Sequence, residues 1–159
     1  MPATMQAKVQ GLLEKSTVYS SDVQTAFTVL LISASFETRR IISKVLEALS
    51  VQVVSGSTLL QARQALSVQR PNLIFCDERL ADGSYADVLT MDYDGRIPPP
   101  LVVLTRTGEW EFYMDATRRG AFDVIRSPWC PTDIELSLIR AAREEKQNAG
   151  RTARPASLA

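Results

Sequence analysis

The chain has 159 residues, of which 45% are hydrophobic and 23% charged, proportions typical of a globular domain with one core. Its 18 basic and 18 acidic residues cancel, so the composition favours neither nucleic acid nor an anionic membrane as an obligatory partner. The chain contains no histidine, which excludes histidine-based acid–base catalysis, histidine metal ligands and the usual nucleophilic triads.

The two cysteines, Cys76 and Cys130, are too far apart in sequence to form a CxxC motif. Cys76 falls in a predicted buried strand, where a small apolar side chain is a simpler interpretation than a redox group. We therefore expect a reducing, cytoplasmic location. No segment has the apolar length of a signal peptide or of a transmembrane helix.

Residues 1–27 differ in pattern from the rest of the chain. Met5, Val9, Leu12 and Leu13 recur at helical spacing and predict a short amphipathic helix, and the polar stretch after it is typical of a linker. The pattern leaves open whether this helix packs on the domain or on a second copy of the chain.

From Thr28 onwards, apolar runs of strand length alternate with amphipathic stretches of helical length. Strands are expected over residues 29–32, 51–54, 73–76, 101–104 and 122–125, and helices over residues 37–49, 57–68, 85–91, 109–119 and 131–145. Ser57 is placed as one possible N-cap of the second helix, and Gly120 is expected to close the fourth.

The ends of the regular pattern set the expected domain boundaries. Three prolines make residues 92–100 a loop, since proline fits neither a helix interior nor a central strand. We expect the domain to span residues 28–147. The polar segment over residues 148–159 has no pattern and is expected to be a disordered tail.

This alternation predicts an α/β fold, a doubly wound five-stranded parallel sheet covered by helices on both faces. Ligand sites of such sheets lie at the carboxyl ends of the strands. Asp77 is the first candidate functional residue, because it is a lone carboxylate that ends the continuous apolar run of the third strand. The Asp82-Gly83 pair after it is interpreted as a turn.

Several stretches carry a resemblance to a known family. They are Val29-Leu-Leu-Ile before the helix that begins at Glu37, Pro71-Asn-Leu-Ile-Phe-Cys-Asp77, Leu80-Ala-Asp-Gly83, Leu101-Val-Val-Leu-Thr105, and Arg119-Gly-Ala-Phe-Asp-Val-Ile-Arg-Ser-Pro128. Their order and spacing resemble the receiver domains of two-component response regulators over about residues 28–145. The resemblance implies a flavodoxin-like topology and a role in signal transduction.

Carried over by position, the resemblance gives two residues a role in phosphorylation. Asp77 stands at the position of the aspartate that accepts a phosphoryl group from a histidine kinase. Thr105 stands at the position of the switch hydroxyl that bonds the new phosphate and pulls a loop inward.

Four other positions depart from the family's pattern. Ser33 and Ala34 replace the acidic pair that holds Mg²⁺, Ser127 replaces the lysine that pairs with the phosphate, and Val124 replaces the aromatic switch residue. Mg²⁺ takes about six oxygen ligands and is usually held by carboxylates. We therefore expect no cofactor, with at most weak Mg²⁺ binding at Asp77 if the chain is phosphorylated.

Three charged residues beside the predicted pocket admit two interpretations each. Arg106 either pairs with Asp77 as a fixed substitute for phosphate and metal, or points to solvent, which we expect. Arg126 is likewise expected at the surface and not as a replacement for the lysine. Glu78 is expected to be solvated, although in the other orientation it would supply an oxygen ligand.

An aromatic cluster falls where receivers form interfaces. Trp110, Phe112 and Tyr113 lie in the fourth predicted helix, and Trp129 follows shortly after the fifth strand. In receivers, the face of the fourth and fifth strand–helix units is the usual docking and dimerisation surface. Exposed aromatic residues would suit an interface, whereas buried ones would pack on the sheet. The resemblance thus implies a histidine kinase or another signalling protein as partner, and a homodimer through this face.

We therefore expect a single-domain, atypical receiver that acts as a protein-interaction module and not as an enzyme, with phosphorylation of Asp77 impaired or absent. Its output is expected through contact with another protein. One alternative is a conventional response regulator of a phosphorelay that uses Asp77. A less favoured alternative is a small flavodoxin-like enzyme or nucleotide-binding protein, since no strand end carries a glycine-rich phosphate loop.

Overall fold

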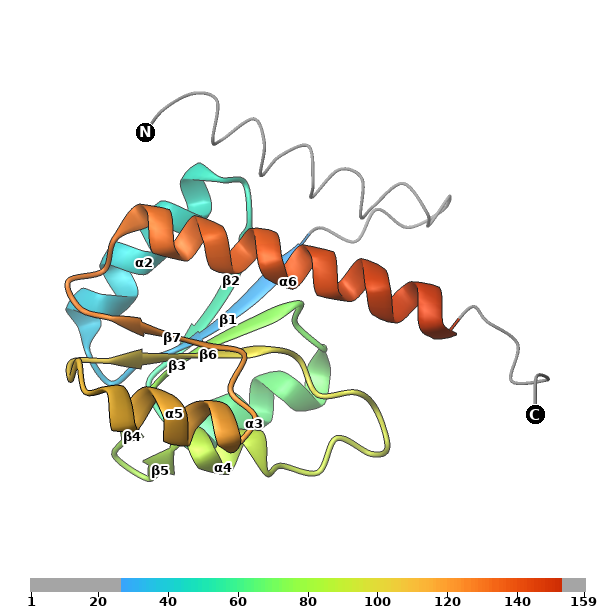
Figure 1. Cartoon of the computed structure of the whole chain (residues 1–159), viewed down its shortest axis with the longest axis horizontal. Coiled ribbons are helices and arrows are strands. Elements are labelled where there is room, and N and C mark those ends of the chain that lie inside the picture. Colours follow the sequence, from blue (N-terminus) through green and yellow to red (C-terminus); the bar gives the residue numbers. More distant parts are fainter. Residues whose placement is uncertain (1–26, 153–159) are drawn as a thin grey trace.

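The structure is a computed structural model that describes residues 27–152, with side chains up to residue 149 (Figure 1). The predicted N-terminal helix and the last seven residues of the predicted tail lie outside the described residues. No helix in the described part is both long enough and apolar enough to cross a membrane.

Among the described residues, five parallel strands form the central sheet in the order β2-β1-β3-β6-β7. They are β1 (Thr28–Ile32), β2 (Gln52–Gly56), β3 (Leu73–Asp77), β6 (Leu101–Thr105) and β7 (Asp123–Arg126). The three inner strands are buried almost throughout, as expected for parallel strands covered on both faces. The predicted doubly wound fold is confirmed.

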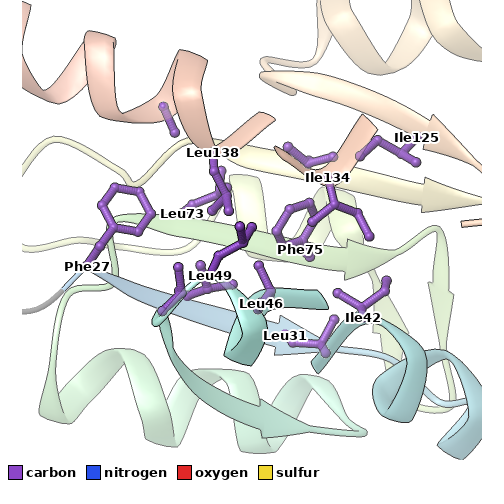
Figure 2. Close-up of a cluster of buried hydrophobic side chains, with 14 of the residues drawn as sticks. Phe27, Leu31, Ile42, Leu46, Leu49, Leu73, Phe75, Ile125, Ile134 and Leu138 are labelled. Atoms are coloured by element: carbon purple, nitrogen blue, oxygen red, sulfur yellow. The ribbon is translucent and has the colours of Figure 1, made fainter. Parts of the chain in front are cut away.

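Helices cover both faces of this sheet (Figure 1). On one face lie α2 (Phe36–Ala48) and α6 (Pro131–Thr152), and on the other lie α3 (Leu59–Val68), α4 (Tyr85–Leu89) and α5 (Trp110–Arg118). Figure 2 shows the core of the first face, where Ile42 and Leu46 of α2 and Ile134 and Leu138 of α6 meet Phe75 of β3. Burial of these aliphatic side chains stabilises the fold by roughly 1.5–3 kcal/mol each.

Two expected helix boundaries were wrong. Helix α3 begins at Leu59 with Thr58 as its N-cap, because the Thr58 hydroxyl, and not that of Ser57, accepts the amide of Gln61. Helix α6 continues to Thr152, so residues 148–152 are helical and do not belong to a disordered tail.

The turn after β3 is more ordered than predicted. Two-residue strands β4 (Arg79–Leu80) and β5 (Gly83–Ser84) pair in an antiparallel hairpin that leads into α4. Strands of two residues are too short to show a period-2 pattern, which is why the sequence predicted only a turn. The loop over residues 92–100 is present as its prolines predict.

Candidate functional site

The candidate site lies at the carboxyl ends of β1, β3 and β6. The chain leaves β1 for α2 on one face of the sheet and leaves β3 for the hairpin and α4 on the other face. Such a switch point opens a crevice at the strand ends. Because Ile32 of β1 pairs with Cys76 of β3, the next residues, Ser33 and Asp77, come out side by side.

Asp77 is held by donors from the β1 end. Its Oδ2 accepts a hydrogen bond from the Ser33 hydroxyl at 2.8 Å and another from the amide of Ala34 at 2.9 Å. The Ser33 hydroxyl oxygen accepts the amide of Ser35 at 3.1 Å, and the nearer acceptor for its own proton is Asp77 and not the Ser35 carbonyl at 3.5 Å. Ser33 is fully buried, which fixes this arrangement.

The Asp77 carboxylate is partly withdrawn from water. Burial raises the pKa of Asp77 above its ordinary value, and the hydrogen bonds from Ser33 and Ala34 oppose this rise. The charges of Arg106 and Arg39 lower the pKa further, but by less than these hydrogen bonds. Desolvation is the largest effect, so the crevice does not fully compensate the ionised carboxylate.

Thr105 points at Glu78 and not at Asp77. Its buried hydroxyl donates to Glu78 Oε2 at 3.0 Å and accepts the amide of Thr107 at 3.1 Å. Among the described residues, no hydrogen bond joins Thr105 to Asp77. Glu78 was expected to be solvated, but its carboxylate instead accepts this hydrogen bond from Thr105. The reason is register: Asp77 pairs with Leu104, which brings the next residues, Glu78 and Thr105, together.

The two arginines at the strand ends both lie at the surface. Arg106 is exposed, and within the described part it forms no ion pair with Asp77, although its charge lowers the Asp77 pKa. Arg126 is also exposed, and its guanidinium lies against Gly108, where a β-carbon would clash. Neither arginine replaces a phosphate, a metal ion or a lysine in this arrangement.

The other positions that depart from the receiver pattern, Ser127 and Val124, have structural contacts at and near the end of β7. The amide of Ser127 donates to the carbonyl of Thr105 at 2.9 Å, which fixes the end of β7 beside β6. Val124 packs against the hydrophobic cluster under α3, α4 and α5. The Ser127–Pro128 peptide bond is cis.

The donors in the crevice do not fit Mg²⁺. The ion takes about six oxygen ligands in octahedral geometry. The described residues contain no group of three or more aspartate, glutamate, cysteine or histidine side chains placed to hold a metal. One oxygen of Asp77 already receives two hydrogen bonds, and Glu78 receives the hydroxyl of Thr105. Hydrogen-bond donors thus occupy Asp77 Oδ2 and Glu78 Oε2, two of the oxygens that would otherwise be available to bind the ion.

Two of the four predicted interface aromatics are exposed. Trp110 is 70% exposed and stacks on Tyr113 with 5.3 Å between ring centroids. Phe112 instead packs edge-on against Tyr85 at 6.1 Å. Trp129 is partly buried, and its indole nitrogen donates to Thr38 at 3.2 Å. Of the four predicted interface aromatics, the stacked pair of Trp110 and Tyr113 is therefore the part that the fold leaves exposed.

Asp82 has a role that the sequence did not reveal. Its carboxylate accepts the amides of Leu59 at 2.7 Å and Leu60 at 3.0 Å, at the start of α3. These amides lower the pKa of Asp82. The partners lie 23 and 22 residues away, so no local pattern could predict the contact. The β4–β5 hairpin thereby ties the strand that ends at Asp77 to the neighbouring helix.

Comparisons with known proteins identify the fold. No protein-family profile and no curated protein sequence matches the chain. Similar solved structures include a signal receiver domain from Vibrio parahaemolyticus, with 21% identity and a TM-score of 0.73 over 82% of this chain and 100% of that one. The chemotaxis response regulator CheY4 of Vibrio cholerae matches with 20% identity and a TM-score of 0.64, over 74% of this chain and 99% of that one. A CheY-like receiver domain protein from Methanospirillum hungatei JF-1 matches with 17% identity and a TM-score of 0.69, over 78% of this chain and 99% of that one. The chain therefore has the fold of response-regulator receiver domains.

Proposed function

We propose that this chain is an atypical receiver-like signalling module that binds a partner protein without phosphorylation of Asp77. One observation carries the proposal. The hydroxyl of Ser33 and the amide of Ala34 donate to Asp77 Oδ2, in the position where a receiver of the usual kind has an acidic pair that holds Mg²⁺.

The chemistry of phosphoryl transfer supports this proposal. Transfer depends on positioning and on cations or donors that neutralise the phosphate oxygens. In the described part of the chain, no positively charged group bonds the Asp77 carboxylate, and Ser127 offers no charge at the lysine position. The Thr105 hydroxyl is already bonded to Glu78. Each of these features disfavours a phosphorylated state, and the module needs no cofactor.

The exposed stack of Trp110 and Tyr113 supports a binding role. Stacked aromatic side chains are large, rigid groups of the kind that dominate protein–protein interfaces. Phe112 and Trp129 pack against the hydrophobic core clusters, whereas Trp110 and Tyr113 belong to neither cluster. The proposed partner is a histidine kinase or another signalling protein, or a second copy of this chain, docked on α5.

The test is the response to beryllofluoride, a phosphoryl analogue. Amide resonances of Asp77 and Thr105 are followed while Mg²⁺ and beryllofluoride are added to the full chain. We expect no saturable shift, and we expect Asp77→Asn to retain partner binding. A matched control restores the pocket with Ser33→Asp, Ala34→Asp and Ser127→Lys, and that variant should respond.

A conventional phosphorelay function is the second candidate. It is favoured by Thr105 at the end of β6 and by Asp77 Oδ1, which accepts no hydrogen bond within the described residues. Saturable shifts in the unmodified chain, together with loss of partner binding in Asp77→Asn, would establish this function and overturn the proposal.

A further inference from the structure

An apolar groove runs along the β2 edge of the sheet, between β2 and α3. It encloses about 250 Å³ and is lined by Leu30, Val54, Ala65 and Val68, together with uncharged neighbours. Strand β2 is an edge strand in the described sheet, since β1 is its only partner there. The groove is remote from the crevice, because its lining includes Thr28 at the start of β1 and not the end of β1.

The groove is flanked by aliphatic side chains that the described fold leaves in water. Val68 is 87% exposed, Leu60 is 59% exposed and Val54 is 45% exposed. Leu60 and Val68 are eight residues apart in α3, which places them on the same side of the helix. Single exposed aliphatic residues are ordinary, but Val54 and Val68 are both exposed while they line the same apolar groove, which marks an interaction site.

We propose that the chain's own N-terminal segment occupies this groove, through the apolar stripe of Met5, Val9, Leu12 and Leu13. The stripe has the i, i+4, i+7, i+8 spacing with which an amphipathic helix anchors in a hydrophobic groove. The segment joins the described fold at the groove itself, because Thr28 is a lining residue.

The size and chemistry of the groove favour side chains over a small molecule. Small-molecule sites usually enclose about 300–1,000 Å³ and carry a few convergent polar groups. This groove is smaller, and none of its lining residues is charged. Aliphatic and thioether side chains such as those of the stripe fit it without leaving a charge desolvated.

The connecting chain is long enough for docking. Fifteen residue steps separate Leu13 from Thr28, which span up to about 50 Å when extended. Helix α3 has ten residues, and its length is therefore only about 15 Å. A tether of this length gives an effective concentration in the millimolar range. The segment of the same chain is therefore favoured over the segment of a second copy in dilute solution.

The test uses the full chain and reciprocal substitutions. Val68→Glu places a charge in the groove and should shift the amide resonances of residues 5–13 and abolish their protection from hydrogen exchange. The double variant Leu12→Glu, Leu13→Glu should in turn shift the amide resonances of Val54 and Ala65. Gln64→Glu, at an exposed position of α3 that does not line the groove, and Gln10→Glu in the segment are the matched controls and should leave the other partner unchanged.

Three results would overturn the proposal. In the first, Val68→Glu leaves residues 5–13 unchanged. In the second, the segment variant shifts resonances elsewhere, such as those of Trp110 and Tyr113. In the third, the reciprocal shifts appear only at high protein concentration together with a dimer in sedimentation, which would assign the groove to a second copy. If Val68→Glu fails to fold, the Leu12→Glu, Leu13→Glu variant still tests the proposal, because it changes no residue of the described core.

Discussion

Asp77 is a carboxylate whose ionised form the fold disfavours, because burial raises its pKa by more than its neighbours lower it. The folded protein therefore binds this proton more tightly than the unfolded chain does. The contribution of Asp77 to stability is fully present below the unfolded pKa of about 3.9 and is lost as the pH rises through the folded pKa.

Asp77→Asn should remove the free-energy cost of burying the ionised carboxylate. The asparagine oxygen can still accept the hydrogen bonds of Ser33 and Ala34, while the desolvated charge is gone. We expect the variant to be at least as stable as the unmodified protein at pH 7, and the difference to vanish below about pH 4. Urea unfolding at both pH values measures it. A clear loss of stability at pH 7 would mean that the hydrogen bonds outweigh desolvation.

The Thr105 hydroxyl contributes to stability through its hydrogen bonds with Glu78 and Thr107. Thr105→Val deprives Glu78 of its donor and the amide of Thr107 of its acceptor. We expect the free energy of unfolding to fall by about 1–2 kcal/mol. Thr105→Ser keeps the hydroxyl and should lose less. Urea midpoints at an unchanged m-value test this, and equal stability of the valine and serine variants would contradict it.

At the scale of single residues, the sequence predicted which side chains lie at strand ends better than it predicted where those side chains point. Asp77 and Ser33 were both expected at strand ends, and the parallel register brings them into contact. The direction of Glu78 was not predictable, because it depends on which strand lies beside β3. Only the pairing of β3 with β6 places a buried hydroxyl within reach of that carboxylate.

At the scale of elements, α3 depends on a residue outside the helix. Asp82→Ala leaves the amides of Leu59 and Leu60 without their acceptor. We expect faster hydrogen exchange in the first turn of α3 and lower stability at neutral pH. Because these amides lower the Asp82 pKa, its contribution is present above about pH 3.9 and is lost as the pH falls through the folded value.

The control for this prediction is Asp82→Asn, which keeps one acceptor oxygen and should retain part of the protection. Exchange rates in α3 that do not differ between Asp82→Ala and the unmodified protein would show that Thr58 alone caps the helix.

Hydrophobic periodicity predicted the elements that are long enough for their buried positions to form a repeating pattern. The buried runs of β1, β3 and β6 and the apolar stripe of α2 are of this kind. The β4–β5 hairpin has two residues per strand and no alternation to detect. The end of α6 was missed because residues 148–152 carry no apolar stripe that hydrophobic periodicity could detect.

For the whole molecule, five strands with intervening helices restrict the topology strongly, since parallel crossovers are right-handed and both faces must be covered. The order β2-β1-β3-β6-β7 is one of few solutions and defines the crevice at its switch point. The opposite end of the sheet was not predicted. There, contacts between distant side chains join the layers.

Glu145 makes the contacts that close this opposite end. Its carboxylate, on α6, accepts Arg70 at 2.7 Å and Asn72 at 2.6 Å, just before β3. The Asn72 side chain in turn accepts the amide of Thr28 at 2.7 Å. One carboxylate thus ties α6 to the starts of β1 and β3.

We expect Glu145→Ala to lower the free energy of unfolding by about 1–3 kcal/mol, because it removes two hydrogen bonds that involve a charged group. The m-value should not change, since the same surface is exposed on unfolding. Amide resonances at Asp77 should also stay in place, because the crevice lies at the other end of the strands. The matched control is Glu144→Ala, which removes the same charge from the adjacent position. An equal loss in both variants would assign the effect to helix charge and not to the contacts of Glu145.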